Sequence, residues 1–599
     1  MTFTADPPLP LPRPLPRSRT RPLRAKPYLH CAPLPDGVYF SGARAQFTLR
    51  GWDRLFKVAD ICVPLLEDGT SEDELVSALG SEQARPVVRR LVEGLREHGM
   101  LLEPARWTVP APEDALRTRY AGPLAHLESV HPDPYAAFAR VRAATVAVIG
   151  PDAAVRPALR GLTRAGIGRV VAAEADADVD VDVDVVIRCV APGERAEWTR
   201  WLDAIDATDT LDGFDAFDSS DAEASRPRTR AVVLPVWLHD EVLVVGPAGD
   251  PGSGAALFDR ALAWARSTQA GPAARPVADA LAGALAAQLA FDVVAGIDDT
   301  GTAHVLHGAE LRSERVSLAL DRPGPESFIE LDDAVESATV LTRRWTGLFD
   351  RSSREDRSPQ MPLSLRELTV VGRGMDKGPV TVWAPHQQAA TLAAALEGLR
   401  RSCATADGPD GAVPAAGLGE RQWLLDGALR LLTDRATEPA PVADEVSDPE
   451  TRRLRKILDG LSPGRPHHIQ LSHVPGIDWR LSTVTDAATG AVLGRAWAPD
   501  AEGAVRDGVS TAIARAQVPG PDGAGSPVSA LCTNALLLAD AGDLASLDTQ
   551  VSAHARAHHV RYAGQPLRED PVLGELPFWH GPVQARPIRP LAAEENDEH

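Results

Sequence analysis

The chain of 599 residues is long enough for about four domains, and its hydrophobic share of 44% is typical of globular proteins. A formal net charge of −21 argues against nucleic acid as the main partner, because an acidic surface repels a polyanion. The five cysteines form no CxxC pair, which argues against a disulfide framework or a cysteine zinc site and favours a reducing cytoplasm. No run is long and apolar enough to predict a membrane-spanning helix.

Residues 1–26 are rich in proline and arginine and predict a disordered tail. Proline disfavours a helix, and the apolar core of a signal peptide is missing. We expect a solvated segment with a polyproline bias. Contact between its arginines and an acidic partner is the alternative.

The stretch from Pro27 to Glu103 predicts a small sheet followed by three helices. Two β-rich runs, Tyr39-Phe40 and Phe47 to Leu49, are separated by the turn signal Ser41-Gly42. Apolar residues then recur at helical spacing in three successive segments. The second segment begins with the capping-box sequence Ser71-Glu72-Asp73-Glu74. This order of elements outlines a winged helix.

A winged helix has two functional interpretations here. Four arginines on the third helix would suit the phosphates of DNA, namely Arg85, Arg89, Arg90 and Arg96. Against DNA, the whole chain is acidic and no flanking segment extends the basic patch. Alternatively, the edge of such a sheet accepts a peptide as an added strand beside the helix. The charge of the chain favours the peptide.

The same stretch carries short motifs in a fixed order. They are Gly37-Val38-Tyr39-Phe40, Phe47 before Gly51, Leu65 to Thr70, Glu74-Leu75, and Leu91 to Leu95 before Gly99-Met100-Leu101. In this order they resemble the PqqD-like recognition element of RiPP biosynthesis, which grips the leader of a ribosomally made, modified peptide. The resemblance implies leader binding between the edge strand and the third helix. The candidate peptide-binding residues are Arg44, Gln46, Phe47, Thr48 and Leu49 on the strand, and Arg85, Val88, Arg89, Leu91 and Val92 on the helix.

After a linker at residues 106–112, a β-α-β unit predicts a parallel, Rossmann-like α/β domain. Ala144 to Gly150 is a buried strand, Val155 to Ala165 a helix, and Gly168 to Glu174 the next strand. Two more strands, a long Ala/Leu helix from Ala274 to Val294 and an antiparallel strand pair from Thr302 to Leu320 follow. The pattern resembles the ThiF-like fold of ubiquitin-activating-type enzymes and of azole-peptide gene clusters.

The turn after the first of these strands bears on nucleotide binding. In active ThiF-like proteins a Gly-rich turn lets the backbone approach the phosphates of ATP. Here Gly150 is followed by Pro151, which lacks a backbone donor, and by Asp152, which adds negative charge. The two CxxC pairs of catalytic relatives are absent, and no cysteine stands in a recognisable nucleophile context. We therefore expect a degenerate ThiF-like domain without a cofactor.

The C-terminal part carries a further ordered set of segments. They are Arg344 to Phe349, Gln360 to Leu363, Gly374 to Gly378 and Ala389 to Arg401. This order resembles the start of a YcaO-type domain, the ATP-dependent cyclodehydratase that forms azolines. The resemblance implies carboxylates that hold magnesium around ATP. Glu397 fits the first carboxylate, but Arg400 and Thr511 stand where further acids are expected. A degenerate YcaO-like domain is one interpretation, and an α/β extension specific to ThiF-like partners is the other.

Three histidines near the C-terminus are the remaining candidate metal ligands. His554 and His558 lie four residues apart on a predicted helix, with His559 beside them, and such a pair can bind metal. No third ligand is evident, so surface histidines are the preferred interpretation, and no metal site is predicted.

Together these features predict a multidomain α/β protein. Residues 1–26 are the tail, 27–108 the winged-helix (PqqD-like) domain, 113–327 the degenerate ThiF-like domain, and 328–599 an α+β docking domain, possibly of degenerate YcaO-like fold. The leading hypothesis is a cytoplasmic, non-catalytic scaffold that binds a precursor leader and delivers it to a separate YcaO cyclodehydratase, with thiazole/oxazole peptides or thiopeptides as products. No catalytic residue, cofactor, metal, nucleic acid or membrane is predicted, and a homodimer is left open. The alternatives are an active fused cyclodehydratase or ThiF-type adenylating enzyme and, third, a winged-helix transcription factor.

Overall fold

The structure is a computed structural model, and it divides into two compact units. Unit 1 comprises Met1–Phe258 and Ala270–Ser317, and unit 2 comprises Asp259–Gln269 and Leu318–His599. The residues that the structure describes are 2–4, 23–52, 54–173, 183–202, 231–268, 271–297, 301–318, 330–350, 362–371, 379–403, 411–436, 438–440, 448–520 and 526–588.

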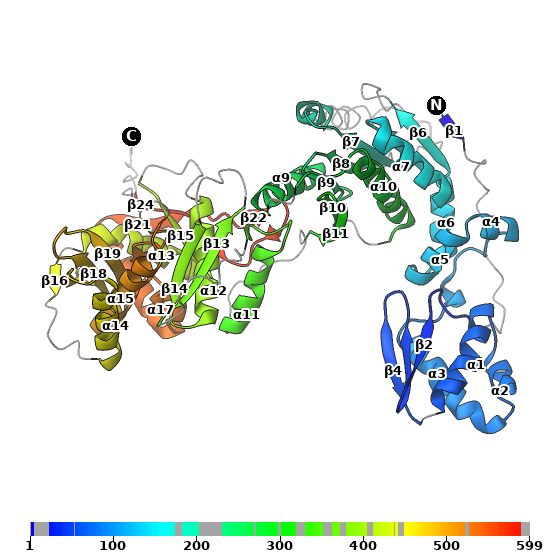
Figure 1. Ribbon diagram of the computed structural model, residues 1–599, viewed down its shortest axis with the longest axis horizontal. Coiled ribbons are helices and arrows are strands. Elements are labelled where there is room, and N and C mark those ends of the chain that lie inside the picture. The colour runs from blue at the N-terminus through cyan, green and yellow to red at the C-terminus, as the bar shows by residue number, and fades with distance from the viewer. Residues whose placement is uncertain are drawn as a thin grey trace, which may run out of the picture. The chain divides into compact units, whose positions relative to one another are not determined.

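Residues 23–103 of unit 1, which we call the N-terminal module, form a three-stranded antiparallel sheet packed on three helices (Figure 1). The strands are β2 (His30–Leu34), β3 (Gly37–Ser41) and β4 (Gln46–Arg50), and the helices are α1 (Leu55–Asp68), α2 (Glu72–Ala78) and α3 (Arg85–Glu97). The predicted order of strands and helices is therefore confirmed. So is the capping box: the Ser71 hydroxyl accepts from the Glu74 N–H, and the Glu74 carboxylate accepts from the Ser71 N–H.

The rest of unit 1 is built around an eight-stranded sheet in the order β1-β6-β5-β7-β8-β9-β10-β11. Strands β6, β5, β7 and β8 run parallel, whereas β9, β10 and β11 continue the sheet antiparallel. This confirms the predicted parallel α/β core. The strands are β1 (Thr2–Thr4), β5 (Thr145–Ile149), β6 (Arg169–Ala173), β7 (Val185–Val190), β8 (Val232–Leu238), β9 (Val242–Val245), β10 (Thr302–His307) and β11 (Arg312–Ser317), and the helices are α4 (Asp114–Arg119), α5 (Ala121–Val130), α6 (Pro134–Ala143), α7 (Asp152–Ala165) and α10 (Val277–Ala295).

The prediction of a disordered tail over residues 1–26 is wrong at both of its ends. Thr2–Thr4 forms β1, which pairs antiparallel with β6 at the edge of the large sheet. The backbone of Leu23 is hydrogen-bonded to that of Thr70 in both directions, at 2.6 and 2.9 Å. Both ends are ordered because they hydrogen-bond to free backbone groups of distant segments. The composition of residues 1–26 does not reveal such distant partners. Residues 5–22 lie outside the described residues.

Within the described ranges, one helix, α10, is long and apolar enough to cross a membrane by length and composition, with a mean hydropathy of 1.6 over its best window. The prediction that the chain has no such run is wrong in this respect. Half of that window is buried, and the apolar side chains of α10, such as Ala282 and Ala286, pack with α7 residues such as Ala158 in the core of unit 1. A core helix of a globular domain explains the same composition.

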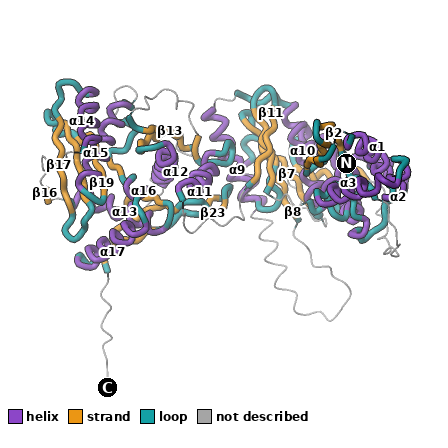
Figure 2. The backbone as a smooth tube through the Cα atoms, turned by 90° about the horizontal axis from the view of Figure 1, so that it is seen from below, coloured by secondary structure: helices purple, strands orange, loops and turns teal. Residues whose placement is uncertain are grey.

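Unit 2 contains two three-stranded sheets, a five-stranded sheet and a two-stranded sheet, with helices packed on them (Figure 2). Helix α15 lies on β18 and β19, and α12 lies on β13 and β14.

Residues 360–361 and 374–378 of the YcaO-like motifs lie outside the described residues. The strands are β12 (Phe349–Asp350), β13 (Ser364–Val370), β14 (Pro379–Ala384), β15 (Val413–Gly417), β16 (Glu438–Ala440), β17 (His467–His473), β18 (Arg480–Asp486), β19 (Val492–Ala498), β20 (Leu531–Cys532), β21 (Val560–Gly564), β22 (Glu569–Asp570), β23 (Gly574–Glu575) and β24 (Trp579–Pro587). The helices are the second half of α9 (Pro251–Thr268), α11 (Leu331–Ala338), α12 (Gln387–Cys403), α13 (Glu420–Leu432), α14 (Pro449–Leu461), α15 (Ala501–Gln517), α16 (Ala535–Leu538) and α17 (Ala541–Ala557).

Candidate peptide-binding site

Strand β4 is an edge of the N-terminal sheet, and its hydrogen-bonding pattern shows which backbone groups are free. The Gly42 N–H donates to the Ala45 carbonyl at 2.9 Å, and the Gly51 N–H donates to the Asp36 carbonyl at 2.8 Å. Hydrogen-bonded pairs alternate with non-bonded pairs along an antiparallel ladder, so residues 47 and 49 also bond to β3. The N–H and C=O groups of Gln46, Thr48 and Arg50 therefore point away from β3, toward the free edge.

The opposite edge strand, β2, offers a poorer template. The same alternation turns the backbone groups of β3 residues 37, 39 and 41 toward β2, where they meet residues 34, 32 and 30. Cys31 and Pro33 are left with their backbone groups on the outer edge of β2. Proline has no N–H and blunts a sheet edge, so a peptide strand would find fewer donors on β2 than on β4.

The side chains of β4 alternate between helix α3 and the solvent. Leu49 is 9% exposed and packs in the core of the module, while Gln46, Thr48 and Arg50 are exposed. Phe47 stacks on Phe40 and on His98, with ring centroids 5.0 and 4.1 Å apart. Phe47 is thus a partly buried apolar ring in the strand that forms the free edge.

Helix α3 approaches β4 at Gly94. A Cβ atom at this position would lie 3.1 Å from the Phe47 ring, so a larger residue would push the helix away from the strand. His98 lies one turn further along α3 and stacks on the same ring. Arg90 and Val87 lie one and two turns before Gly94, on the same flank. This flank of α3, together with Phe47, borders the space beside the edge of β4.

Three of the candidate residues on α3 do not belong to this site. Val88, Leu91 and Val92 are fully buried in the core of the module, so the prediction that they contact a peptide is wrong. Their helical spacing is that of the buried stripe of an amphipathic helix. Truncation of any of them would open a cavity and destabilise the module by about 2–4 kcal/mol.

The two candidate arginines lie on the other flank of α3. Arg85 and Gly94 are nine residues apart, which is half a turn around a helix. The Arg85 guanidinium is already paired with Asp73 of α2 at 2.7 Å and with Glu82 at 2.9 Å. Arg89 lies one turn after Arg85 and is exposed. The structure therefore brings Gln46, Phe47 and Thr48 together at the free edge and separates them from Arg85 and Arg89. Leu49 is buried in the core, so the prediction that it contacts a peptide is wrong as well.

Sequence reasoning missed several residues of the N-terminal module that are candidates for a binding surface. Arg90 and His98 could have been found from Gly94, because a small residue inside a helix often marks a close approach and its neighbours at i±4 share its face. Trp52, which follows β4, is 43% exposed, and Tyr28, which precedes β2, is 56% exposed. Exposed aromatic side chains of this kind are enriched at binding surfaces.

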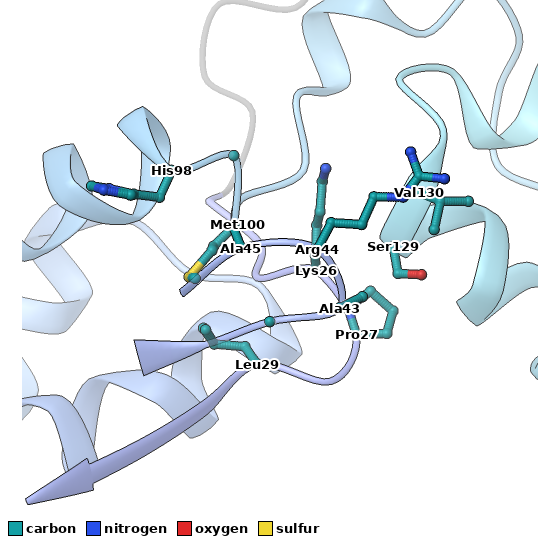
Figure 3. A pocket seen from close by; sticks show the side chains of 12 residues that line it. Lys26, Pro27, Leu29, Ala43, Arg44, Ala45, His98, Met100, Ser129 and Val130 are labelled. Carbon is teal, nitrogen blue, oxygen red and sulfur yellow. The ribbon is translucent and has the colours of Figure 1, made fainter. Parts of the chain in front are cut away.

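A small hollow opens where β4 begins (Figure 3). Its volume is about 80 Å³, and it lies between the β3–β4 hairpin, the segment before β2, the residues after α3, and the end of α5. Figure 3 shows Arg44 extending from the hairpin toward Ser129 and Val130 of α5. Lys26 also lines the hollow. Arg44, predicted as part of the edge strand, thus precedes β4 and faces this hollow.

In unit 2, Glu397 and Arg400 belong to a closed ion-pair network. The Arg400 guanidinium donates to Asp426 at 2.8 Å and to Glu397 at 3.0 Å, and Arg430 donates to Asp426 at 3.0 Å. Burial would raise the pKa of Asp426, but Arg400 and Arg430 outweigh it and hold this pKa below its ordinary value. The carboxylates that would neutralise a metal ion are therefore already neutralised by arginine. Among the described residues, no group of three His, Cys, Asp or Glu side chains is placed to hold a metal.

The surroundings of this network leave little space. The adjoining hollow, lined by Glu397, Arg400 and Arg430, holds about 30 Å³, whereas ligand pockets hold roughly 300–1,000 Å³. The Thr511 hydroxyl accepts from the Trp383 indole N–H at 3.0 Å and donates to the Asp507 carbonyl at 2.8 Å. Thr511 therefore serves the packing of α15 against β14.

Asp507 makes the free energy of unfolding of unit 2 depend on pH. It is 7% exposed, and burial raises its pKa to about 6 from an ordinary 3.8. Because the folded state binds this proton more tightly than the unfolded state, the free energy of unfolding should rise as the pH falls from about 6 toward 4 and decline as the pH rises through 6.

We expect Asp507→Asn to remove this dependence, which amounts to about 3 kcal/mol for a shift of roughly two pKa units. Urea unfolding of both proteins at a series of pH values between 4 and 7.5 measures it. Parallel pH profiles for wild type and variant would show that Asp507 does not titrate in this range.

In unit 1, the turn after β5 is shaped by close packing. Gly150 has a φ of 132°, and a Cβ atom there would lie 2.5 Å from the Cys189 carbonyl, so glycine is needed for packing. Pro151 is the N-cap residue of α7, and Asp152 pairs with Arg156 at 2.5 Å. Burial raises the pKa of the Cys189 thiol to about 12, which makes it a poor nucleophile at neutral pH.

The C-terminal histidines do not converge on a metal position. Nδ1 of His554 lies 3.3 Å from the Pro475 carbonyl, and Nδ1 of His558 lies 2.8 Å from the His554 carbonyl. Burial lowers the pKa of His554, which keeps its ring neutral. These contacts tie the end of α17 to the loop after β17.

Comparison with solved structures defines the class of fold: a multidomain α/β protein that shares its architecture with a heterocyclase over nearly the whole chain. That structure is described as a heterocyclase in complex with substrate and cofactor, and the match covers 95% of this chain and 95% of the other, with a TM-score of 0.55 and 13% identity. A structure of E. coli MccB with succinimide matches 49% of this chain and 96% of its own, with a TM-score of 0.33 and 11% identity. No protein-family model matches the sequence, and no curated protein matches it significantly.

Proposed function

We propose that this chain binds the leader of a ribosomal precursor peptide as an added strand on β4 and delivers it to a separate YcaO-type cyclodehydratase that forms thiazoline or oxazoline rings. The observation that carries the proposal is the free edge of β4, with three residues whose N–H and C=O groups point outward beside an apolar ring and a helix flank. Main-chain hydrogen bonds to such an edge give affinity, and adjacent side-chain sites give specificity.

The heterocyclase fold supports the proposal at the level of architecture. In this proposal the N-terminal module is a PqqD-like recognition element, the sheet of unit 1 is a ThiF-like domain, and unit 2 is a degenerate YcaO-like domain that docks the active enzyme. Binding the leader and the enzyme on one chain raises the effective concentration of the substrate. Thiopeptides and related azole peptides are the proposed products, and the cytoplasm the proposed location.

The test of this proposal uses the full chain and a fluorescein-labelled leader of the precursor encoded in the same gene cluster. We expect saturable binding by fluorescence anisotropy. We also expect faster ring formation by the partner cyclodehydratase at sub-saturating precursor when this chain is added. Absence of leader binding, with the chain folded by circular dichroism, would refute the proposal.

A double variant of Arg85 and Arg89 tests which flank of α3 contacts the peptide. Arg85→Ala/Arg89→Ala should leave leader affinity within about twofold of wild type, because both side chains lie half a turn away from the β4 flank. Arg90→Ala, on the β4 flank, should weaken the affinity for an acidic leader by about threefold to tenfold. This is the effect expected from the loss of one partly exposed charge contact. The reverse ranking would place the peptide between α2 and α3 instead.

The alternative, an enzyme with its own ATP-dependent activity, is less well supported because Arg400 occupies the centre of its carboxylate cluster. We expect MgATP to leave the melting temperature of the chain unchanged, since a ligand stabilises a protein only by binding its folded state. Peptide-dependent ATP hydrolysis by this chain alone would reverse the assignment.

A further inference from the structure

The hollow at the start of β4 differs in charge from the chain as a whole. The protein carries 83 acidic residues against 62 lysines and arginines. Yet the described lining of the hollow includes two cations, Lys26 and Arg44, together with His98, and no acidic side chain. A cationic hollow on an acidic protein is a specific feature of this surface, because it opposes the overall charge.

No acidic side chain among the described residues that line the hollow neutralises the positive charge of Lys26 and Arg44. Burial lowers the pKa of Lys26, Glu103 acts in the opposite direction, and Arg44 and Arg106 lower it further. Glu103 is itself ion-paired with Arg106. Among the described residues, the Lys26 ammonium forms no ion pair within 4 Å, so an anion entering the hollow would meet uncompensated positive charge.

The hollow is continuous with the β4 edge along the chain. Ala45 lines it, and the next residue, Gln46, is the first of β4 with outward-facing backbone groups. A peptide strand paired with Gln46, Thr48 and Arg50 would therefore leave the edge at the hollow. A single water molecule needs about 10–15 Å³ of such space, so a hollow of about 80 Å³ has room for a short side chain.

Part of the lining of the hollow comes from outside the N-terminal module. Ser129 and Val130 end helix α5, and this helix is tied to the module by the ion pair between Arg24 and Glu128 at 3.3 Å. The Tyr135 hydroxyl donates to the same Glu128 carboxylate at 2.7 Å and fixes its position. The hollow is thus a built feature of unit 1, made by two parts of the chain that are held together.

We infer that this hollow binds the carboxylate of an aspartate or glutamate side chain of the bound peptide, at the residue next to the segment paired with β4. The inference rests on the proposed function and adds its specificity: an extended peptide with one acidic anchor. Lys26 and Arg44 supply two positive charges, and the peptide carboxylate would partly neutralise them.

The test begins with selection of 12-residue peptides from a random phage library on the full chain. One enriched peptide is made with a fluorescein label, in its original form and with the acidic residue replaced by its amide. Fluorescence anisotropy measures both dissociation constants, and hydrogen–deuterium exchange reports protection of β4. On the wild type we expect the amide peptide to bind about tenfold more weakly, as for one charge-assisted contact.

Two double variants complete the cycle. In Lys26→Met/Arg44→Gln the acidic and amide peptides should bind equally, both at the level of the amide peptide on the wild type. The matched control is Lys57→Met/Arg89→Gln, which removes the same charge from exposed positions elsewhere in the module and should keep the tenfold difference. Circular dichroism confirms that each variant is folded.

The outcomes separate this inference from the proposed function. Peptides that protect β4 without any dependence on an acidic residue would overturn the carboxylate site and leave leader binding intact. A tenfold dependence that survives in Lys26→Met/Arg44→Gln would likewise overturn it. Selected peptides that bind without protecting β4 would overturn the proposed function itself.

Discussion

Thr48→Pro is expected to weaken leader binding by at least about 100-fold while the N-terminal module stays folded. The N–H of Thr48 points to the free edge and makes no bond within the sheet. Proline removes this donor, and its ring occupies the space where a peptide strand would pair. The loss of at least two main-chain hydrogen bonds in a peptide contact of about three residues accounts for the size of the effect.

The matched control is Thr48→Val, which keeps the N–H and the shape of the side chain. We expect it to bind the leader within about threefold of wild type. Equal binding by Thr48→Pro and wild type would exclude β-strand addition at this edge. Loss of the folded module in Thr48→Pro, seen as a lower melting temperature, would instead show that the N–H is needed within the sheet.

Arg400→Ala is expected to destabilise unit 2 by about 3–5 kcal/mol, because it removes the closest cation from two buried carboxylates. Glu397 would keep only a 4.0 Å contact with Arg401, and Asp426 would keep only Arg430. Arg400 contacts both carboxylates within 3.0 Å, and its side chain is 11% exposed. Differential scanning calorimetry of the full chain should show a lower melting temperature for one transition, with the other unchanged.

The control for this change is Arg452→Ala, an exposed arginine on α14, which should shift the transition by no more than about 0.5 kcal/mol. The pH dependence offers a second check. The pKa of Asp426 is depressed in the folded state, so its stabilising contribution is present above the unfolded pKa and lost as the pH falls through the folded value. A wild-type stability for Arg400→Ala would mean that the network has no structural role.

The local elements of this protein could be predicted because their signals are local. The capping box at Ser71 and the turn between β3 and β4 depend on residues within four positions of one another. The buried strands β5 and β8 follow from continuous apolar runs.

The composition of the binding site was harder to predict, and Val88, Leu91 and Val92 show why. The periodicity that predicts α3 also marks its buried side, so these residues could not serve both the core and a peptide. The flank that faces β4 is set by the packing of Gly94 on Phe47, which joins positions 47 residues apart. Similarly, the sequence shows arginine where an acid was expected at position 400, but its pairing with Asp426 depends on how α12 and α13 pack.

The most direct test of leader binding at β4 is hydrogen–deuterium exchange on the full chain, with and without the leader of its gene cluster. Our account predicts slower exchange at the amides of Gln46, Thr48 and Arg50, which have no partner within the sheet of the free protein. The β4 amides that already bond to β3 should change little. Leader binding with unchanged exchange at these three amides, or protection confined to the α2–α3 flank, would contradict it.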